Sequence, residues 1–185
     1  MITFKFNFEK AVQAAGVVLR LHHGRMEYLR LLKILYIADR ELLAETGRTL
    51  TGDRAVAMKN GPVLSEVYDL LKGQAARAGE WDAAIRTEKY EVVLREPVPV
   101  GKLTKAEANK LTQLCDRYRD TNSYDLSELT HDFAEWAEKF DAKCPNPPQS
   151  IAWETALTGQ GRAYLIGEVV QRLRDRESAA AAFGE

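Results

Sequence analysis

The stretch from about Met26 to Thr46 constrains the fold more than any other part of the sequence. As a helix, it carries apolar residues around much of its circumference, at Leu29, Leu32, Leu35, Tyr36, Leu42 and Leu43. A surface helix has one apolar stripe, whereas a helix that is apolar on most sides lies inside a core. The sequence therefore predicts a helix near the centre of the fold, ended by Gly47.

Length, charge and cysteine content narrow the class of protein. A chain of 185 residues is the size of one domain, and such a chain buries roughly 70% of the surface that its unfolded form exposes. The 26 basic and 27 acidic residues leave a net charge of −1, which excludes a globally basic nucleic-acid binder. Cys115 and Cys144 are far apart, and no apolar run approaches the roughly 18 residues of a membrane span. We expect a cytoplasmic protein with reduced thiols and no signal peptide.

Capping residues mark the predicted helices. Asn7 is a candidate N-cap for a first helix that stops at Gly24. Thr104 and Glu107 have the spacing of a capping box, in which each side chain accepts a hydrogen bond from a backbone N–H of the other. A further helix is expected over Ser123–Phe140.

The segment between these helices predicts a small sheet. Strands are expected at 55–58 and 90–94, with weaker candidates at 83–86 and 98–100. Residues 59–62 are expected to form a turn, and Pro62 suits the first turn of a helix that reaches Gly73. A loop is expected over 74–80.

The C-terminal part follows a proline-rich break at Cys144–Pro148. A final helix has one apolar stripe, formed by Leu165, Ile166, Val169, Val170 and Leu173. We predict one domain over residues 1–176 and a frayed tail over 177–185. The predicted fold class is α+β and mostly α-helical, with about six or seven helices and a small inserted antiparallel sheet or hairpin.

The sequence offers weak candidates for a reactive centre. His131 needs a carboxylate to orient it as a general base, and the adjacent Asp132 points elsewhere on a helix, so a distant partner such as Asp39 or Asp53 is required. His22 and His23 project about 100° apart on a helix and cannot easily share one metal ion. The arginines and lysines of the first two helices alternate with acidic residues, a pattern typical of a solvated face. We therefore expect no catalytic residue, cofactor or metal site.

Residues Leu32–Lys72 resemble the Panacea domain, also described as SocA-like antitoxin. The resemblance rests on an ordered series: Lys33–Asp39 (KILYIAD), Thr51-Gly52-Asp53, Val56–Met58, Gly61-Pro62-Val63 and Val67-Tyr68. A second, weaker match is Leu126–His131 followed by Trp136, and the whole resemblance spans roughly Phe8 to Trp153. It implies an antitoxin of a bacterial or phage toxin–antitoxin system, active in phage defence, which binds and neutralises a cognate toxin protein.

Candidate partner-contact residues come from these motifs. They are Tyr36, Asp39, Asp53, Met58, Asn60, Gly61, Pro62, Val63, Tyr68, His131 and Trp136. Asn60-Gly61-Pro62 is expected to hold a rigid loop, and a preorganised loop loses less entropy on binding. A purely structural interpretation stays open, in which Asp39 hydrogen-bonds the Gly61-Pro62 turn.

Four alternatives remain open. The resemblance also suggests an adaptor that delivers a toxin to a cytosolic protease, for which the alanine-rich end after Glu177 is the motivating feature. A DNA-binding autoregulator is disfavoured because no compact helix-turn-helix is evident. An enzyme that uses His131 is a third alternative, and a homo-oligomer is a fourth.

Overall fold

The computed structural model describes residues 1–143 and 148–183. Within them the chain forms nine helices and two three-stranded antiparallel sheets, which confirms the α+β, mostly helical class. The helices are α1 Phe8–Leu21, α2 Tyr28–Thr46, α3 Ser65–Leu71, α4 Ala78–Ala84, α5 Lys105–Arg117, α6 Ser123–His131, α7 Ala134–Ala137, α8 Trp153–Gly159 and α9 Leu165–Phe183. The strands are β1 Arg25–Glu27, β2 Ala55–Met58, β3 Gly61–Leu64, β4 Ile85–Glu88, β5 Glu91–Leu94 and β6 Gln149–Ile151. Cys144, and with it most of the predicted proline-rich break, lies outside the described residues.

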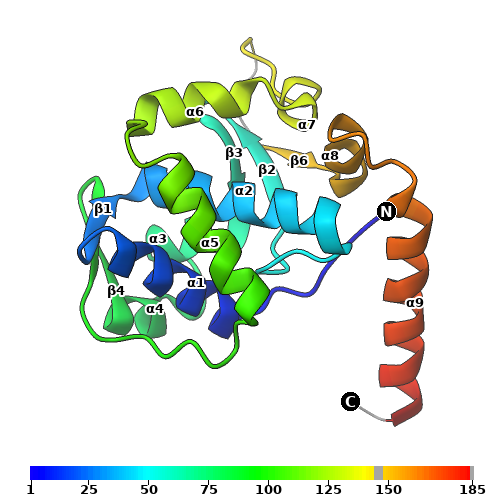
Figure 1. The fold of residues 1–185 in the computed structure, drawn as a ribbon, viewed down its shortest axis with the longest axis horizontal. Coiled ribbons are helices and arrows are strands. Elements are labelled where there is room, and N and C mark those ends of the chain that lie inside the picture. Colours follow the sequence, from blue (N-terminus) through cyan, green and yellow to red (C-terminus); the bar gives the residue numbers. More distant parts are fainter. Residues whose placement is uncertain (144–147, 184–185) are drawn as a thin grey trace.

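Helix α2 runs through the centre of the molecule, as predicted (Figure 1). Every residue from Arg30 to Asp39 is buried. Gly47 closes the helix in the left-handed conformation, with φ +68°, and its N–H donates to Leu43 O. This φ strains any residue that has a Cβ, so glycine is the residue expected here.

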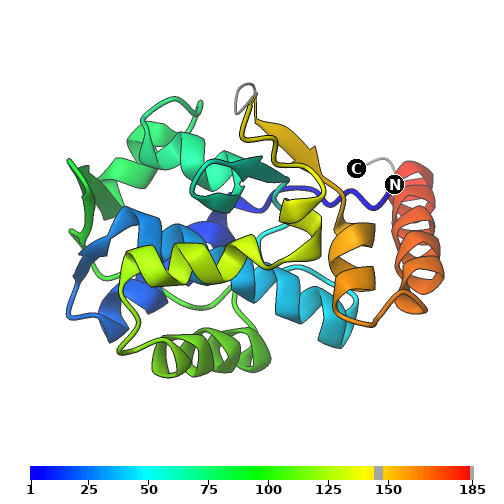
Figure 2. The ribbon, with the colours of Figure 1, turned by 90° about the horizontal axis from the view of Figure 1, so that it is seen from above.

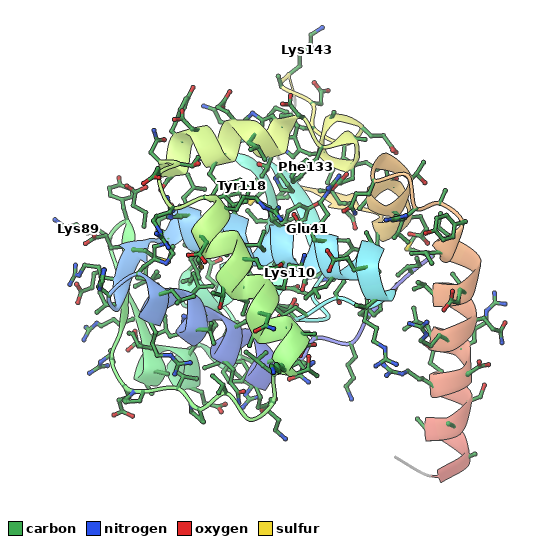
Figure 3. All side chains as sticks on the ribbon, in the orientation of Figure 1. Glu41, Lys89, Lys110, Tyr118, Phe133 and Lys143 are labelled. Carbon is green, nitrogen blue, oxygen red and sulfur yellow. The ribbon has the colours of Figure 1, made fainter. Side chains whose placement is uncertain are left out.

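The two capped helices α1 and α5 pack against each other and α5 packs on α2 (Figure 1). The Asn7 side chain accepts from Lys10 N, and Thr104 and Glu107 form the full capping box, so both predicted caps are confirmed. Lys110 of α5 reaches α2, where its Nζ lies 3.0 Å from Glu41 and 2.6 Å from Glu45 (Figure 3).

The sheets differ from the prediction in their short outer strands. One has the order β1-β5-β4 and the other β3-β2-β6. Strands at 55–58, 90–94 and 83–86 were predicted within a few residues, but β1 and β6 were not, and residues 98–100 form no strand. Pro62 lies in β3 and not in a helix. Since β3 is an edge strand, the N–H that proline lacks is not needed for a second strand partner.

Two helical predictions need correction. The loop expected over 74–80 ends early, because α4 begins at Ala78. The single helix expected over Ser123–Phe140 is two helices, α6 and α7, separated at Asp132 and Phe133. Helix α9 runs to Phe183, and the domain boundary at residue 177 stays a prediction.

Helix α9 stands at the side of the molecule next to the N-terminus (Figure 2). Its first half packs through Val169, which is 1% exposed. Arg172 Nη1 donates to Thr46 O at 3.0 Å, which places a cation at the C-terminal end of α2. No helix in the described part of the chain is both long enough and apolar enough to cross a membrane.

Candidate functional site

The predicted site residues gather around the β2–β3 hairpin and the elements that pack on it. Tyr36 and Asp39 lie on α2, His131 ends α6, and Trp136 lies on α7. Most of the set is buried, namely Tyr36, Asp39, Asp53, Gly61, Pro62 and Val63. Met58, Tyr68, His131 and Trp136 are half-buried, and Asn60 at the hairpin turn is exposed. The motif therefore forms mainly interior contacts, with a partly exposed rim at the hairpin.

Three side chains from three helices hold the hairpin by its carbonyl groups. Trp136 Nε1 of α7 donates to Met58 O at 2.9 Å. Ser127 Oγ of α6 donates to Asn60 O at 2.6 Å, and Lys33 Nζ of α2 donates to Pro62 O at 2.7 Å. These hydrogen bonds connect α2, α6 and α7 to one turn.

Gly61 lies where these helices meet the hairpin. Its φ is +88°, and a Cβ at this position would lie 2.3 Å from Thr130 Oγ1 and 2.9 Å from Lys33 Nζ. Both the backbone conformation and the close approach of these two side chains therefore require glycine.

Asp39 organises the loop that follows α2, and not the Gly61-Pro62 turn as the structural interpretation supposed. Its Oδ1 accepts from Leu50 N at 2.7 Å and from Thr51 N at 2.9 Å. Its Oδ2 accepts from Thr51 Oγ1 at 2.5 Å. Burial raises the pKa of this carboxyl to about 7, and the hydrogen bonds from Thr51 and Leu50 oppose the shift.

Asp53 holds the start of α3 from outside the helix. Its two carboxyl oxygens accept from Glu66 N and Val67 N, each at 3.0 Å. These are N–H groups of the first helical turn, which have no partner within the helix. Burial raises the pKa of Asp53 to about 6, against the effect of these backbone hydrogen bonds.

A buried ionic cluster between α2 and α7 was not predicted from the sequence. Tyr36 Oη donates to Glu135 Oε1 at 2.9 Å, and Arg40 Nε donates to the same oxygen at 2.5 Å. Glu135 is 1% exposed. The Arg40 guanidinium also lies 4.0 Å from the centre of the Phe133 ring. The cluster docks α7 on α2 and ties the end of the motif to its start.

The prediction that the charged residues of α2 form a solvated face is wrong. Lys33 is fully buried and Arg30 is 9% exposed. Arg30 donates to backbone carbonyls of the loop after α5, including Arg119 O at 3.2 Å. Because α2 is surrounded on all sides, its charged side chains have to find internal partners, and this could have been inferred from the circumferential apolar pattern itself.

His131 has none of the predicted carboxylate partners. Its ring stacks on Trp136 with centroids 4.0 Å apart, and its Nδ1 lies 3.3 Å from Glu128, not near Asp39 or Asp53. Its Nε2 is buried and has no hydrogen-bond partner within the described chain. The contacts of His131 are thus those of a packing residue on the hairpin rim.

Lys33 gives a pH-dependent prediction. Burial lowers its pKa from 10.5 to about 7, so between these two pH values the unfolded chain binds more protons at this site than the folded one. The contribution of Lys33 to stability should therefore rise with pH across this window, by up to about 1.4 kcal/mol per pH unit. Urea unfolding of the wild type and Lys33→Met at pH 7, 8 and 9 measures the difference, and equal slopes of stability against pH would contradict it.

The polar groups of the motif are thus engaged inside the protein. Between them Lys33, Asp39 and Asp53 bind main-chain groups of the hairpin, the loop after α2 and the start of α3. No cluster of three or more histidine, cysteine or acidic side chains that could hold a metal occurs in residues 1–143 and 148–183. This arrangement can fix the shape of a surface.

Comparison with known proteins gives one match. The family model described as antitoxin SocA-like, Panacea domain, matches residues 31–137, which run from α2 to the end of α7. No curated protein and no solved structure matches the chain.

Proposed function

Because the chain belongs to the SocA-like antitoxin family, the Panacea domain, we propose that it neutralises a cognate protein toxin by direct protein–protein binding. The toxin would be occupied by a preformed surface, without a cofactor and without turnover.

The strongest support for this proposal is that the polar side chains of the motif bind main-chain groups inside the protein. The matched region begins with α2 and ends with α7, and its buried side chains hold one hairpin and two loop segments in place. A rigid surface of this kind loses little conformational entropy on binding. Specific complexes bury roughly 1,600 Å² in total, an area that a domain of this size can supply.

The test is co-expression with the product of the neighbouring gene. Neutralisation by binding predicts that growth is restored and that the two proteins elute as one complex in size-exclusion chromatography. If growth is restored and no complex forms with the purified full chain, direct binding is wrong.

The adaptor alternative has one supporting observation, the exposed C-terminal half of α9. Residues 174–179 are exposed, and the helix extends beyond the body of the protein (Figure 1). An adaptor shortens the lifetime of its partner, whereas a blocking antitoxin does not. The half-life of the toxin, measured after translation is stopped with and without the antitoxin, separates the two.

A substitution at His131 separates binding from catalysis. His131→Phe keeps a ring on Trp136 and removes a buried nitrogen without a partner, so we expect normal folding and unchanged toxin binding. His131→Ala loses the stacked pair and should destabilise the protein by about 1 kcal/mol. Loss of growth rescue by a well-folded His131→Phe protein that still binds the toxin would instead favour an enzyme.

A further inference from the structure

A groove lined by both polar and apolar residues separates α9 from the body of the protein. It has a volume of about 410 Å³, in the range typical of ligand-binding clefts. Its floor is formed by the N-terminal segment 3–10 and by the loop 48–52, and the start of α5 closes one end. These parts are fixed: Asn7 N donates to Thr51 O at 2.8 Å, and the loop is held by Asp39.

One face of α9 forms the opposite wall. The lining residues Leu173, Arg176, Glu177 and Ala180 follow the spacing of three and four residues that defines one side of a helix. Leu173 and Ala180 are half-buried, and Arg176 and Glu177 are exposed. Since Arg172 ties the helix to the end of α2, this face is held over the groove.

The charges that line the groove are predominantly positive. Lys10 and Glu107 neutralise each other, with Lys10 Nζ 2.5 Å from Glu107 Oε1. In residues 1–143 and 148–183, Lys5, Arg48 and Arg176 form no ion pair, and Glu177 is the one acidic residue of the lining that also has none. Three exposed cations therefore face the groove against one exposed carboxylate.

The N-cap side chains of both helices that begin at the groove are already engaged. Asn7 already caps α1 and Thr104 already caps α5. Among the described lining residues, Lys5, Arg48 and Arg176 are the cations without an ion pair and are therefore available to an anionic ligand. They come from three separate segments, so a ligand that contacts all three must lie across the groove between α9 and the body.

We propose that this groove binds an acidic segment of the toxin, held between α9 and the loop 48–52. The inference rests on the proposed function, since it names the surface through which the toxin is bound. A peptide with a few carboxylates matches three cations, which are fewer than the roughly six to ten phosphate contacts that give a DNA-binding protein a steep salt dependence. Because the cations are exposed, their attraction should act mainly on the association rate and weaken with salt.

The experiment measures binding of the full-length chain to the product of the neighbouring gene by biolayer interferometry at 50 and 500 mM NaCl. The test variant combines Lys5→Glu, Arg48→Glu and Arg176→Glu. A matched control combines Arg86→Glu, Lys89→Glu and Lys143→Glu, three exposed cations outside the groove. Lys89 lies at the end of the molecule opposite α9 (Figure 3). A neutral variant combines Lys5→Gln, Arg48→Gln and Arg176→Gln, which removes the positive charges without adding negative ones. Circular dichroism checks that each variant is folded.

The proposal predicts a rise in Kd of about tenfold or more for the groove variant at 50 mM NaCl. A smaller rise in Kd is expected for the neutral variant and little change for the control. The binding of both groove variants should depend less on salt than that of the wild type.

If the wild type binds and the groove variants bind equally well, the groove is not the docking site, although the proposed function stands. If the wild type does not bind, both proposals fail. A 20-base-pair DNA duplex is measured in the same way as the toxin. If the wild type binds the duplex as tightly as the toxin, with the same sensitivity to salt, and the groove variant does not bind it, the groove is a nucleic-acid site and the inference is overturned.

Discussion

Replacing Asp39 with alanine is expected to destabilise the protein by about 4 kcal/mol, because three donors lose their acceptor in a buried site. The donors are Leu50 N, Thr51 N and Thr51 Oγ1, and an unsatisfied buried donor costs about 1–3 kcal/mol. Urea unfolding at pH 8 measures the loss. A change below about 1 kcal/mol would show that these hydrogen bonds do not hold the loop.

The conservative substitution Asp39→Asn provides the control. It keeps the size of the side chain and one acceptor oxygen, so we expect about half the loss. The loop that Asp39 holds also forms part of the groove floor. A protein with Asp39→Asn that remains folded should therefore bind the toxin more weakly, whereas a stability effect without a binding effect would separate this loop from the docking surface.

Replacing Gly61 with alanine is expected to cost about 3 kcal/mol or more. The left-handed conformation, φ +88°, costs a residue with a Cβ about 1–2 kcal/mol. The new methyl group would also lie 2.3 Å from Thr130 Oγ1 and 2.9 Å from Lys33 Nζ, and such overpacking costs about 1–3 kcal/mol. Urea unfolding of the variant gives the sum of both effects.

Gly73→Ala isolates the conformational part. Gly73 has a similar φ of +71°, and a Cβ there would meet no atom within 4 Å. We therefore expect a loss of about 1–2 kcal/mol for Gly73→Ala. Equal losses in the two variants would mean that the contacts of Lys33 and Thr130 around Gly61 carry no energetic weight.

The helix positions that were predicted correctly depend on residues close together in the sequence. The circumferential apolar pattern identified α2, the left-handed glycine identified its end at Gly47, and the spacing of Thr104 and Glu107 identified the start of α5. Each of these depends on residues within a few positions of one another. The position of β2 was predicted for the same reason.

The features that were not predicted from the sequence depend on contacts between residues that are far apart along the chain. The three-residue strand β1 exists because it pairs with β5, and β6 exists because it pairs with β2. The internal roles of Lys33 and Glu135 depend on partners 29 and 99 residues away along the chain. No spacing rule connects such residues, so the identity of their partners becomes visible only when α6, α7 and the hairpin are in place.

The central claim is that the protein acts by occupying another protein, and a stoichiometric titration tests it most directly. A fixed amount of purified toxin, the product of the neighbouring gene, is mixed with increasing amounts of the full-length chain, and the residual toxin activity is measured. Occupancy predicts a linear loss of activity that is complete at a fixed molar ratio and does not change with incubation time. Complete inactivation by far less than one equivalent, increasing with time, would contradict the account and identify a catalyst.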